Sequence, residues 1–106
     1  MDGMKIRIKE GRITQELATS LLGEFNVSNI LAAAGVARSL GITWDKITKA
    51  VADFSGIPGR MEEIKNKKGF RVIVDFAHTP NALESLLKTV KKSTKGKVIT
   101  VFGSAG

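Results

Sequence analysis

The stretch FRVIVDFAHTP, residues 70–80, decides the fold of this 106-residue chain. Its apolar run FRVIVDF predicts a buried β-strand, and the segment PNALESLLKTVKK at 80–92 predicts a helix with Thr79 as its N-cap. Asp75, His78 and Thr79 therefore come together in one loop between a strand and a helix. α/β proteins place their ligands in such loops.

A second apolar run, KVITVF at 97–102, follows the predicted helix. Residues 70–103 are therefore expected to form one strand-helix-strand unit with parallel strands and a right-handed crossover. The unit ends in the glycine-rich stretch GSAG at 103–106. The predicted fold class is α/β.

The upstream half has a different pattern. Apolar and polar residues alternate on the two sides of Glu10-Gly11, so residues 4–17 predict a β-hairpin at a sheet edge. Helical spacing predicts a helix at 28–40, beginning at Asn26 or Ser28 and stopped by Gly41, and another at 44–54 capped by Thr43. The apolar positions expected to line their buried faces are Ile30, Leu31, Ala33, Ala34, Val36, Ala37 and Leu40 in the first, and Ile47, Ala50, Val51 and Phe54 in the second.

The segment SGIPG at 55–59 breaks the helical pattern and is the best candidate for a domain boundary or hinge. Beyond it, RMEEIKN and FRVIVDF predict a second hairpin that turns at 67–69.

Composition limits the chemistry of the chain. It has no cysteine and one histidine, which excludes disulfides, a thiolate nucleophile and a multi-histidine metal site. The net charge of +7 suggests nucleic-acid binding as an alternative function. Lysines at a helix end and on turns need no binding partner, however, and no tyrosine is present for base stacking. Binding of nucleotide phosphates is a third explanation of the positive charge. The polar first residues and the lack of a long apolar run predict a cytoplasmic protein that does not enter a membrane.

Four blocks occur in a fixed order: GEFNVSNILAAAGVARSLGI, SGIPGRME, VDFAHTPNALE and VITVFGSAG. This order resembles the Mur ligases of peptidoglycan synthesis, most strongly their UDP-N-acetylmuramoyl-tripeptide synthetase branch, which adds the third residue of the stem peptide. The resemblance implies that residues 1–57 are the C-terminal part of the central ATP-binding domain. It also implies that residues 58–106 begin a Rossmann-like C-terminal domain with a hairpin and a βαβ unit.

The resemblance implies ATP-dependent amide formation through an acyl phosphate, with ATP and Mg²⁺ as cofactors of the parent enzyme. The chain has no G-x-x-x-x-G-K-[ST] loop. We therefore expect an internal piece of a larger enzyme, inactive alone, to which no catalytic residue and no metal ligand is assigned. The alternatives are a folylpolyglutamate synthase-type ligase, whose motif differs at Thr79, and a small basic nucleic-acid-binding module.

Five residues are implied as nucleotide contacts. The resemblance places Asn29 near the adenine, Arg60 at the phosphates, Asp75 at the ribose and phosphates, and His78 against the nucleotide. Thr79 begins a helix whose amides can receive a phosphate. Each also has a structural explanation: Asn29 or Asn26 as a helix cap, Arg60 as a solvated side chain, Asp75 as a cap or lysine partner, His78 as a packing residue and Thr79 as an N-cap.

A central domain cut in half is expected to expose the apolar faces of the helix at 28–40 and of the hairpin at 4–17. A second copy or the missing part of the enzyme would cover them. A homodimer is expected to form when two copies exchange structural elements about the hinge at 55–59.

Overall fold

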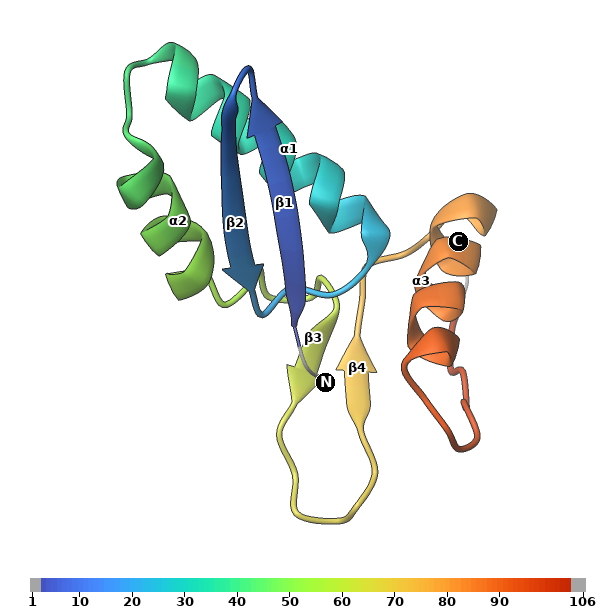
Figure 1. Ribbon diagram of the computed structural model, residues 1–106. Coiled ribbons are helices and arrows are strands. Elements are labelled where there is room, and N and C mark those ends of the chain that lie inside the picture. Colours follow the sequence, from blue (N-terminus) through green and yellow to red (C-terminus); the bar gives the residue numbers. More distant parts are fainter. Residues whose placement is uncertain (1–2, 104–106) are drawn as a thin grey trace. The chain divides into compact units, whose positions relative to one another are not determined.

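The computed structural model describes residues 3–103, and the chain divides into two compact units between Gly56 and Ile57 (Figure 1). The division falls within the predicted SGIPG segment. Each unit is described by itself. No helix in residues 3–103 combines the length and the apolar character needed to cross a membrane.

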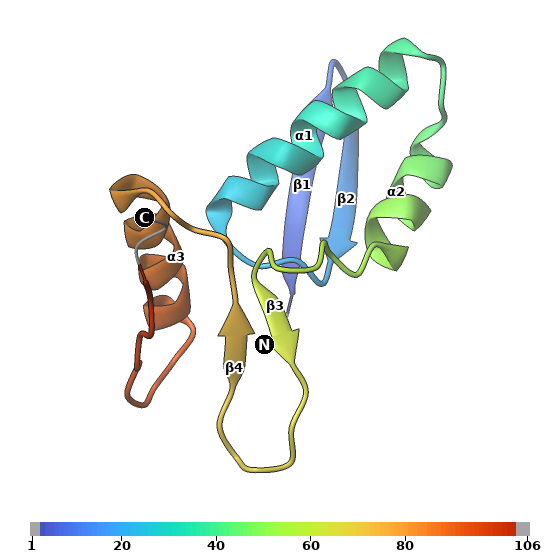
Figure 2. The same cartoon turned by 180° about the vertical axis from the view of Figure 1, so that it is seen from behind.

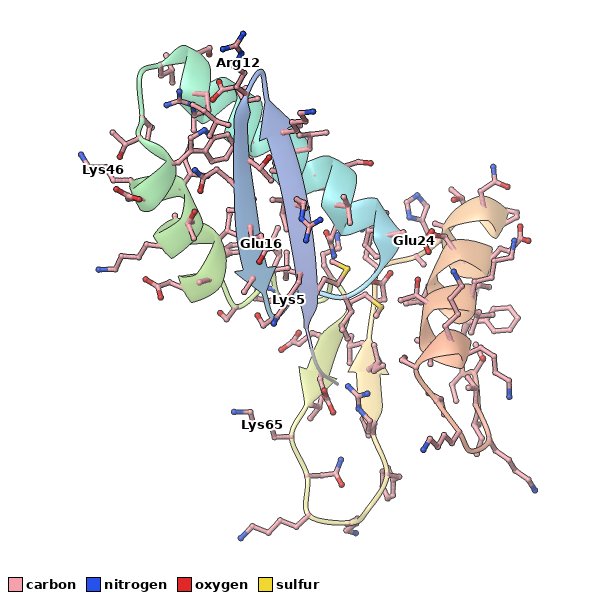
Figure 3. The ribbon with its side chains drawn as sticks, viewed as in Figure 1. Lys5, Arg12, Glu16, Glu24, Lys46 and Lys65 are labelled. Atoms are coloured by element: carbon pink, nitrogen blue, oxygen red, sulfur yellow. The ribbon has the colours of Figure 1, made fainter. Side chains whose placement is uncertain are left out.

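The first unit begins with the predicted hairpin. β1 (Met4–Glu10) pairs antiparallel with β2 (Ile13–Thr19), with Ile6 opposite Leu17. The connection passes through Gly11 at φ 59, a left-handed conformation that glycine adopts without a side-chain clash. The polar face of the hairpin carries an exposed ion pair of 3.0 Å between Arg7 and Glu16, and Lys5 lies on the same strand pair (Figure 3).

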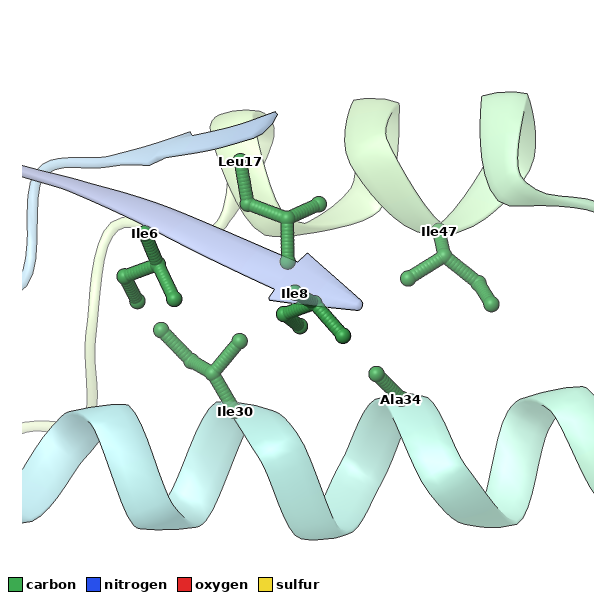
Figure 4. Close-up of a cluster of buried hydrophobic side chains, with 6 residues drawn as sticks. All are labelled: Ile6, Ile8, Leu17, Ile30, Ala34 and Ile47. Carbon is green, nitrogen blue, oxygen red and sulfur yellow. The ribbon is translucent and has the colours of Figure 1, made fainter. Parts of the chain in front are cut away.

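Two helices cover the apolar side of this hairpin. α1 (Glu24–Ser39) crosses the hairpin on one face, and α2 (Trp44–Asp53) packs along β2 (Figure 2). Side chains from both helices meet those of the hairpin in one cluster (Figure 4), formed by Ile6, Ile8, Leu17, Ile30, Ala34 and Ile47. Burial of each larger aliphatic side chain stabilises the unit by about 1.5–3 kcal/mol. The expectation that the apolar face of the hairpin is left exposed is therefore wrong.

α1 differs from its prediction at its start and on one side. It begins at Glu24 after Gly23 at the N-cap, without a side-chain cap. Asn26, predicted to be the cap, lies inside the first turn and donates its Nδ2 to the Leu22 carbonyl at 2.8 Å. Leu31 is 52% exposed, and Val36 and Leu40 are exposed as well. The helix is apolar on nearly every side, so periodicity alone did not distinguish its buried face.

The predicted stop of α1 is confirmed, whereas the predicted cap and buried face of α2 are confirmed only in part. Gly41, at φ 79, follows the α1 C-cap, and the amides of Gly41 and Ile42 bond back to Arg38 and Ala37, which confirms the glycine stop. Thr43 occupies the N-cap of α2, but its hydroxyl makes no cap bond. Ala50 and Phe54 were expected on the buried face of this helix, yet both are exposed.

A polar contact ties the end of β1 to both helices. Glu10 accepts a hydrogen bond of 2.8 Å from Trp44 Nε1 and one of 3.1 Å from Arg38 Nε. The Arg38 guanidinium also lies 5.5 Å from the Trp44 ring centre. The Trp44 hydrogen bond, assisted by Arg38, lowers the pKa of Glu10 below its ordinary value.

This lowered pKa makes the stability of the first unit depend on pH. A carboxylate with a depressed folded-state pKa stabilises above its unfolded value, about 4.3 for glutamate, and loses that contribution as the pH falls through the folded pKa. We expect the urea midpoint, followed by Trp44 fluorescence, to fall between pH 7 and pH 3 by more in the wild type than in Glu10→Gln. Equal falls in both proteins would contradict an energetic role for this contact.

The second unit begins with the other predicted hairpin. β3 (Glu62–Ile64) pairs antiparallel with β4 (Val72–Val74), with Ile64 opposite Val72. The strands are shorter than predicted because Asn66 closes the loop between them. Its Nδ2 donates to the Phe70 carbonyl at 3.0 Å, and its Oδ1 accepts from the Lys68 amide at 2.9 Å.

α3 (Pro80–Lys92) follows as predicted, with Thr79 as its N-cap. The predicted strand at 97–102 is wrong within the described residues, since this segment forms no strand and leaves Ile99 86% and Val101 94% exposed. A β-prone segment becomes a strand only when a neighbouring edge accepts its hydrogen bonds. The predicted βαβ unit therefore lacks its second strand, and Ser104–Gly106 of the GSAG stretch lie outside the described residues.

Candidate functional site

A tight turn at the start of the second unit presents Arg60. The Arg60 amide donates to the Ile57 carbonyl at 3.0 Å, with Pro58 and Gly59 between them. Gly59 has φ 70, the left-handed conformation that the third position of a type II turn requires. Glu62 Oε2 accepts the Gly59 amide at 2.7 Å. The glycine-proline segment expected to act as a hinge is thus a closed turn from Ile57 onward.

Asp75 fastens this turn to the loop that follows β4. Its Oδ2 accepts the Met61 amide at 2.8 Å, and its Oδ1 accepts the Ala77 amide at 2.7 Å. The carboxylate therefore joins residues that lie fourteen and two positions away along the chain. Within residues 3–103 it pairs with no lysine and does not cap α3. Sequence reasoning placed Asp75 in the correct loop but did not identify its backbone partners.

Arg60, Phe76 and His78 form an exposed cluster. The Arg60 guanidinium lies 4.8 Å from the centre of the Phe76 ring. The His78 ring centre lies 4.9 Å from that of Phe76, and His78 Nδ1 is 3.2 Å from the Phe76 carbonyl oxygen. Phe76 itself is 60% exposed. An exposed aromatic ring with a cation on it is suited to a flat, anionic ligand.

Phe76 is the member of this cluster that sequence reasoning missed. It looked like the last apolar residue of a buried strand, because FRVIVDF is continuous in apolar character. β4 ends two residues earlier, at Val74, so the ring emerges on the loop. The signal that could have found it is its position between Asp75 and His78, within the loop already expected to bind.

Thr79 and Asn29 are engaged within the fold. The Thr79 hydroxyl oxygen accepts the Ala82 amide at 3.3 Å, which confirms the N-cap. Asn29 belongs to the first unit, on α1, where its Nδ2 donates to Asn26 Oδ1 at 3.1 Å. Arg60, Asp75, His78 and Thr79 all belong to the second unit.

A cleft of about 640 Å³ lies in the second unit, lined by β4, α3 and the segment that follows α3. Its lining includes the apolar residues Ile73, Leu86, Leu87 and Val90, together with Asp75. Arg60, Phe76 and His78 are not among its lining residues. The same cleft is also lined by the cationic side chains of Arg71, Lys95 and Lys97. In residues 3–103 no three metal-ligating side chains gather.

Residues 59–106 match the family described as Mur ligase, glutamate ligase domain. A UDP-N-acetylmuramoyl-L-alanyl-D-glutamate–2,6-diaminopimelate ligase from Bacillus velezensis is 43% identical over 93 residues, which cover 88% of this chain and 19% of the relative. A UDP-N-acetylmuramyl-tripeptide synthetase from a Roseiflexus species is 42% identical over 105 residues, covering 99% of this chain and 21% of the relative. The chain therefore spans about a fifth of the length of these relatives.

Two solved structures are also similar to this chain. A pseudomurein peptide ligase type C from Methanothermus fervidus matches with a TM-score of 0.74 at 34% identity, over 92% of this chain and 19% of that one. MurF from Acinetobacter baumannii matches with a TM-score of 0.77 at 22% identity, over 86% of this chain and 20% of that one. The second likeness concerns the fold alone.

Proposed function

We propose that this chain is part of an ATP-dependent ligase that adds the third residue of the stem peptide. The premise is its homology to a segment of Mur ligases of the UDP-N-acetylmuramoyl-tripeptide synthetase type. Residues 1–57 would end the central ATP-binding domain, and residues 58–106 would begin the C-terminal domain. The family match over 59–106 supports the second assignment. The names of several relatives favour 2,6-diaminopimelate as the incoming amino acid.

The observation that carries the proposal is the cluster of Arg60, Phe76 and His78 held together in the second unit. The planar guanidinium of Arg60 would bind the phosphates of ATP, since its donor fork matches their oxygens. His78 and Asp75 would lie at the ribose side. In the first unit, an adenine contact of Asn29 stays a prediction made from the resemblance alone. The amide groups at the start of α3, after Thr79, offer a further place for a phosphate.

ATP supplies the phosphoryl group that activates the substrate carboxylate for amide formation. Fixed positive charge is what this segment would contribute, because phosphoryl transfer depends largely on positioning and charge stabilisation. The residues present do not fit Mg²⁺, since the described part of the chain gathers no set of metal ligands. No step through the metal is assigned to this segment. The relatives' names favour this function over a folylpolyglutamate synthase-type ligase.

A segment exchange tests the proposal. The matching 93-residue stretch of the Bacillus velezensis ligase is replaced by that of this chain, which is 43% identical to it. We expect the exchanged enzyme to form the amide product with ATP, Mg²⁺, UDP-linked dipeptide and diaminopimelate. The measurement is product formation by chromatography, together with binding of ATP by calorimetry.

The control exchange uses the matching segment of the Geobacter sulfurreducens ligase, whose identity to this chain is 44% over 93 residues. Activity in that control shows that the scaffold accepts a segment from another ligase. An exchanged enzyme that melts cooperatively but neither binds ATP nor forms product, beside an active control, would overturn the proposed function.

A further inference from the structure

We infer that the carboxylates of Glu62 and Asp75 together clamp the backbone on either side of Arg60. This clamp holds the Arg60 guanidinium against the exposed Phe76 ring, so Glu62 and Asp75 are positioning residues for it. The inference goes beyond the proposed function because it assigns a role to Glu62 and adds, for Asp75, a positioning role through its backbone hydrogen bonds. Only its consequence for ATP rests on the proposed function. The clamp itself is a property of the second unit.

Glu62 holds one side of Arg60. The turn that presents Arg60 places Gly59 at φ 70, and Glu62 Oε2 accepts the Gly59 amide at 2.7 Å. This amide has no carbonyl partner within the turn, because the turn's own hydrogen bond uses the Arg60 amide. A single carboxylate oxygen of Glu62 therefore supplies the acceptor that the turn itself does not supply.

Asp75 holds the other side. Met61 has φ 49, the left-handed region that a side chain such as methionine rarely enters. The Met61 amide donates to Asp75 Oδ2 at 2.8 Å, and the second oxygen of the same carboxylate accepts the Ala77 amide at 2.7 Å. Phe76 is the residue between Asp75 and Ala77. One carboxylate thus fixes both the strained residue after Arg60 and the loop that carries the ring.

The two carboxylates differ in how many acceptor oxygens they use. Glu62 accepts the Gly59 amide through one oxygen, whereas Asp75 accepts two amides, one on each oxygen. A side-chain amide offers one acceptor oxygen and one donor nitrogen. Glutamine can therefore replace Glu62 in the clamp, but asparagine cannot replace Asp75 without setting its NH₂ group against a backbone N–H.

The test is nuclear magnetic resonance on the 106-residue chain with four variants. The ring-current shift of the Arg60 side-chain protons reports the stacking on Phe76, and amide exchange at Gly59, Met61 and Ala77 reports the clamp. Glu62→Gln is expected to preserve both. Glu62→Met has a similar shape but no acceptor oxygen. Glu62→Met and Asp75→Asn are expected to lose most of the ring-current shift, and their amide protection factors are expected to fall about tenfold. Glu63→Gln, which removes the negative charge from the neighbouring ion pair with Arg71, is the control and is expected to leave Arg60 unchanged.

An unchanged Arg60 shift in both Glu62→Met and Asp75→Asn would overturn the clamp, as would equal damage from Glu62→Gln and Glu62→Met. If Asp75→Asn unfolds the unit, the comparison of Glu62→Gln with Glu62→Met still tests the clamp. The exchanged ligase adds a second measurement, in which Glu62→Met raises the KM for ATP and Glu62→Gln does not. A clamp pattern in the isolated chain without this KM pattern would support the clamp and count against the nucleotide role of Arg60.

Discussion

Leu17→Ala is expected to unfold the first unit of the chain. Leu17 is the one large side chain among the described residues with 0% exposure, and it lies between α2 and the isoleucines of β1. Removing a buried leucine down to alanine costs about 2–5 kcal/mol, through lost burial and the cavity that remains. A unit this small has a total stability at the low end of about 5–15 kcal/mol. The single substitution therefore removes a large part of it.

Trp44, the only tryptophan of the chain, reports this transition because it packs against the same core. We expect urea unfolding of Leu17→Ala, followed by Trp44 fluorescence, to show a much lower midpoint or no folded baseline. The matched control is Leu31→Ala on the outer side of α1, where the side chain is 52% exposed and the midpoint is expected to change little. Equal losses in the two variants would show that the core is placed wrongly.

Arg60→Ala is expected to cause the largest loss of function. In the exchanged Bacillus velezensis ligase, it should lower kcat/KM for ATP by about 10- to 100-fold, because a hydrogen bond to a charged group contributes about 1.5–3 kcal/mol. Arg60→Lys keeps the charge but loses the planar fork and the stacking on Phe76, so it should recover only part of the activity. Steady-state kinetics with varied ATP measure both effects.

Arg7→Ala is the matched control for this experiment. Arg7 is also an exposed arginine, but its partner is Glu16 on the neighbouring strand, and such surface pairs contribute about 0–1 kcal/mol. Its kcat/KM for ATP is expected to equal that of the unmodified exchange. If Arg60→Ala behaves like Arg7→Ala, the assignment of Arg60 to the phosphates is wrong.

The candidate site was predictable in its members more than in its contacts. The end of the predicted strand FRVIVDF and the loop after it predicted Asp75, His78 and Thr79 as site residues, because α/β proteins place their ligands where a strand leads into a helix. The backbone amides that Asp75 accepts were not predictable, since one of them belongs to Met61, fourteen residues away. The exposure of Phe76 was not predictable either, because it depends on where β4 stops pairing with β3.

The sequence by itself determined the local elements: the hairpin that passes through Gly11, the glycine stop after α1, and the start of α3 at Thr79. These follow from backbone preferences and capping within a few residues, which no distant partner has to supply. Only the tertiary structure decided which of the apolar sides of α1 is buried, because that choice depends on the side chains that the hairpin presents. It also decided that 97–102 is not a strand in this structure, because a strand exists only where a neighbouring edge takes up its hydrogen bonds.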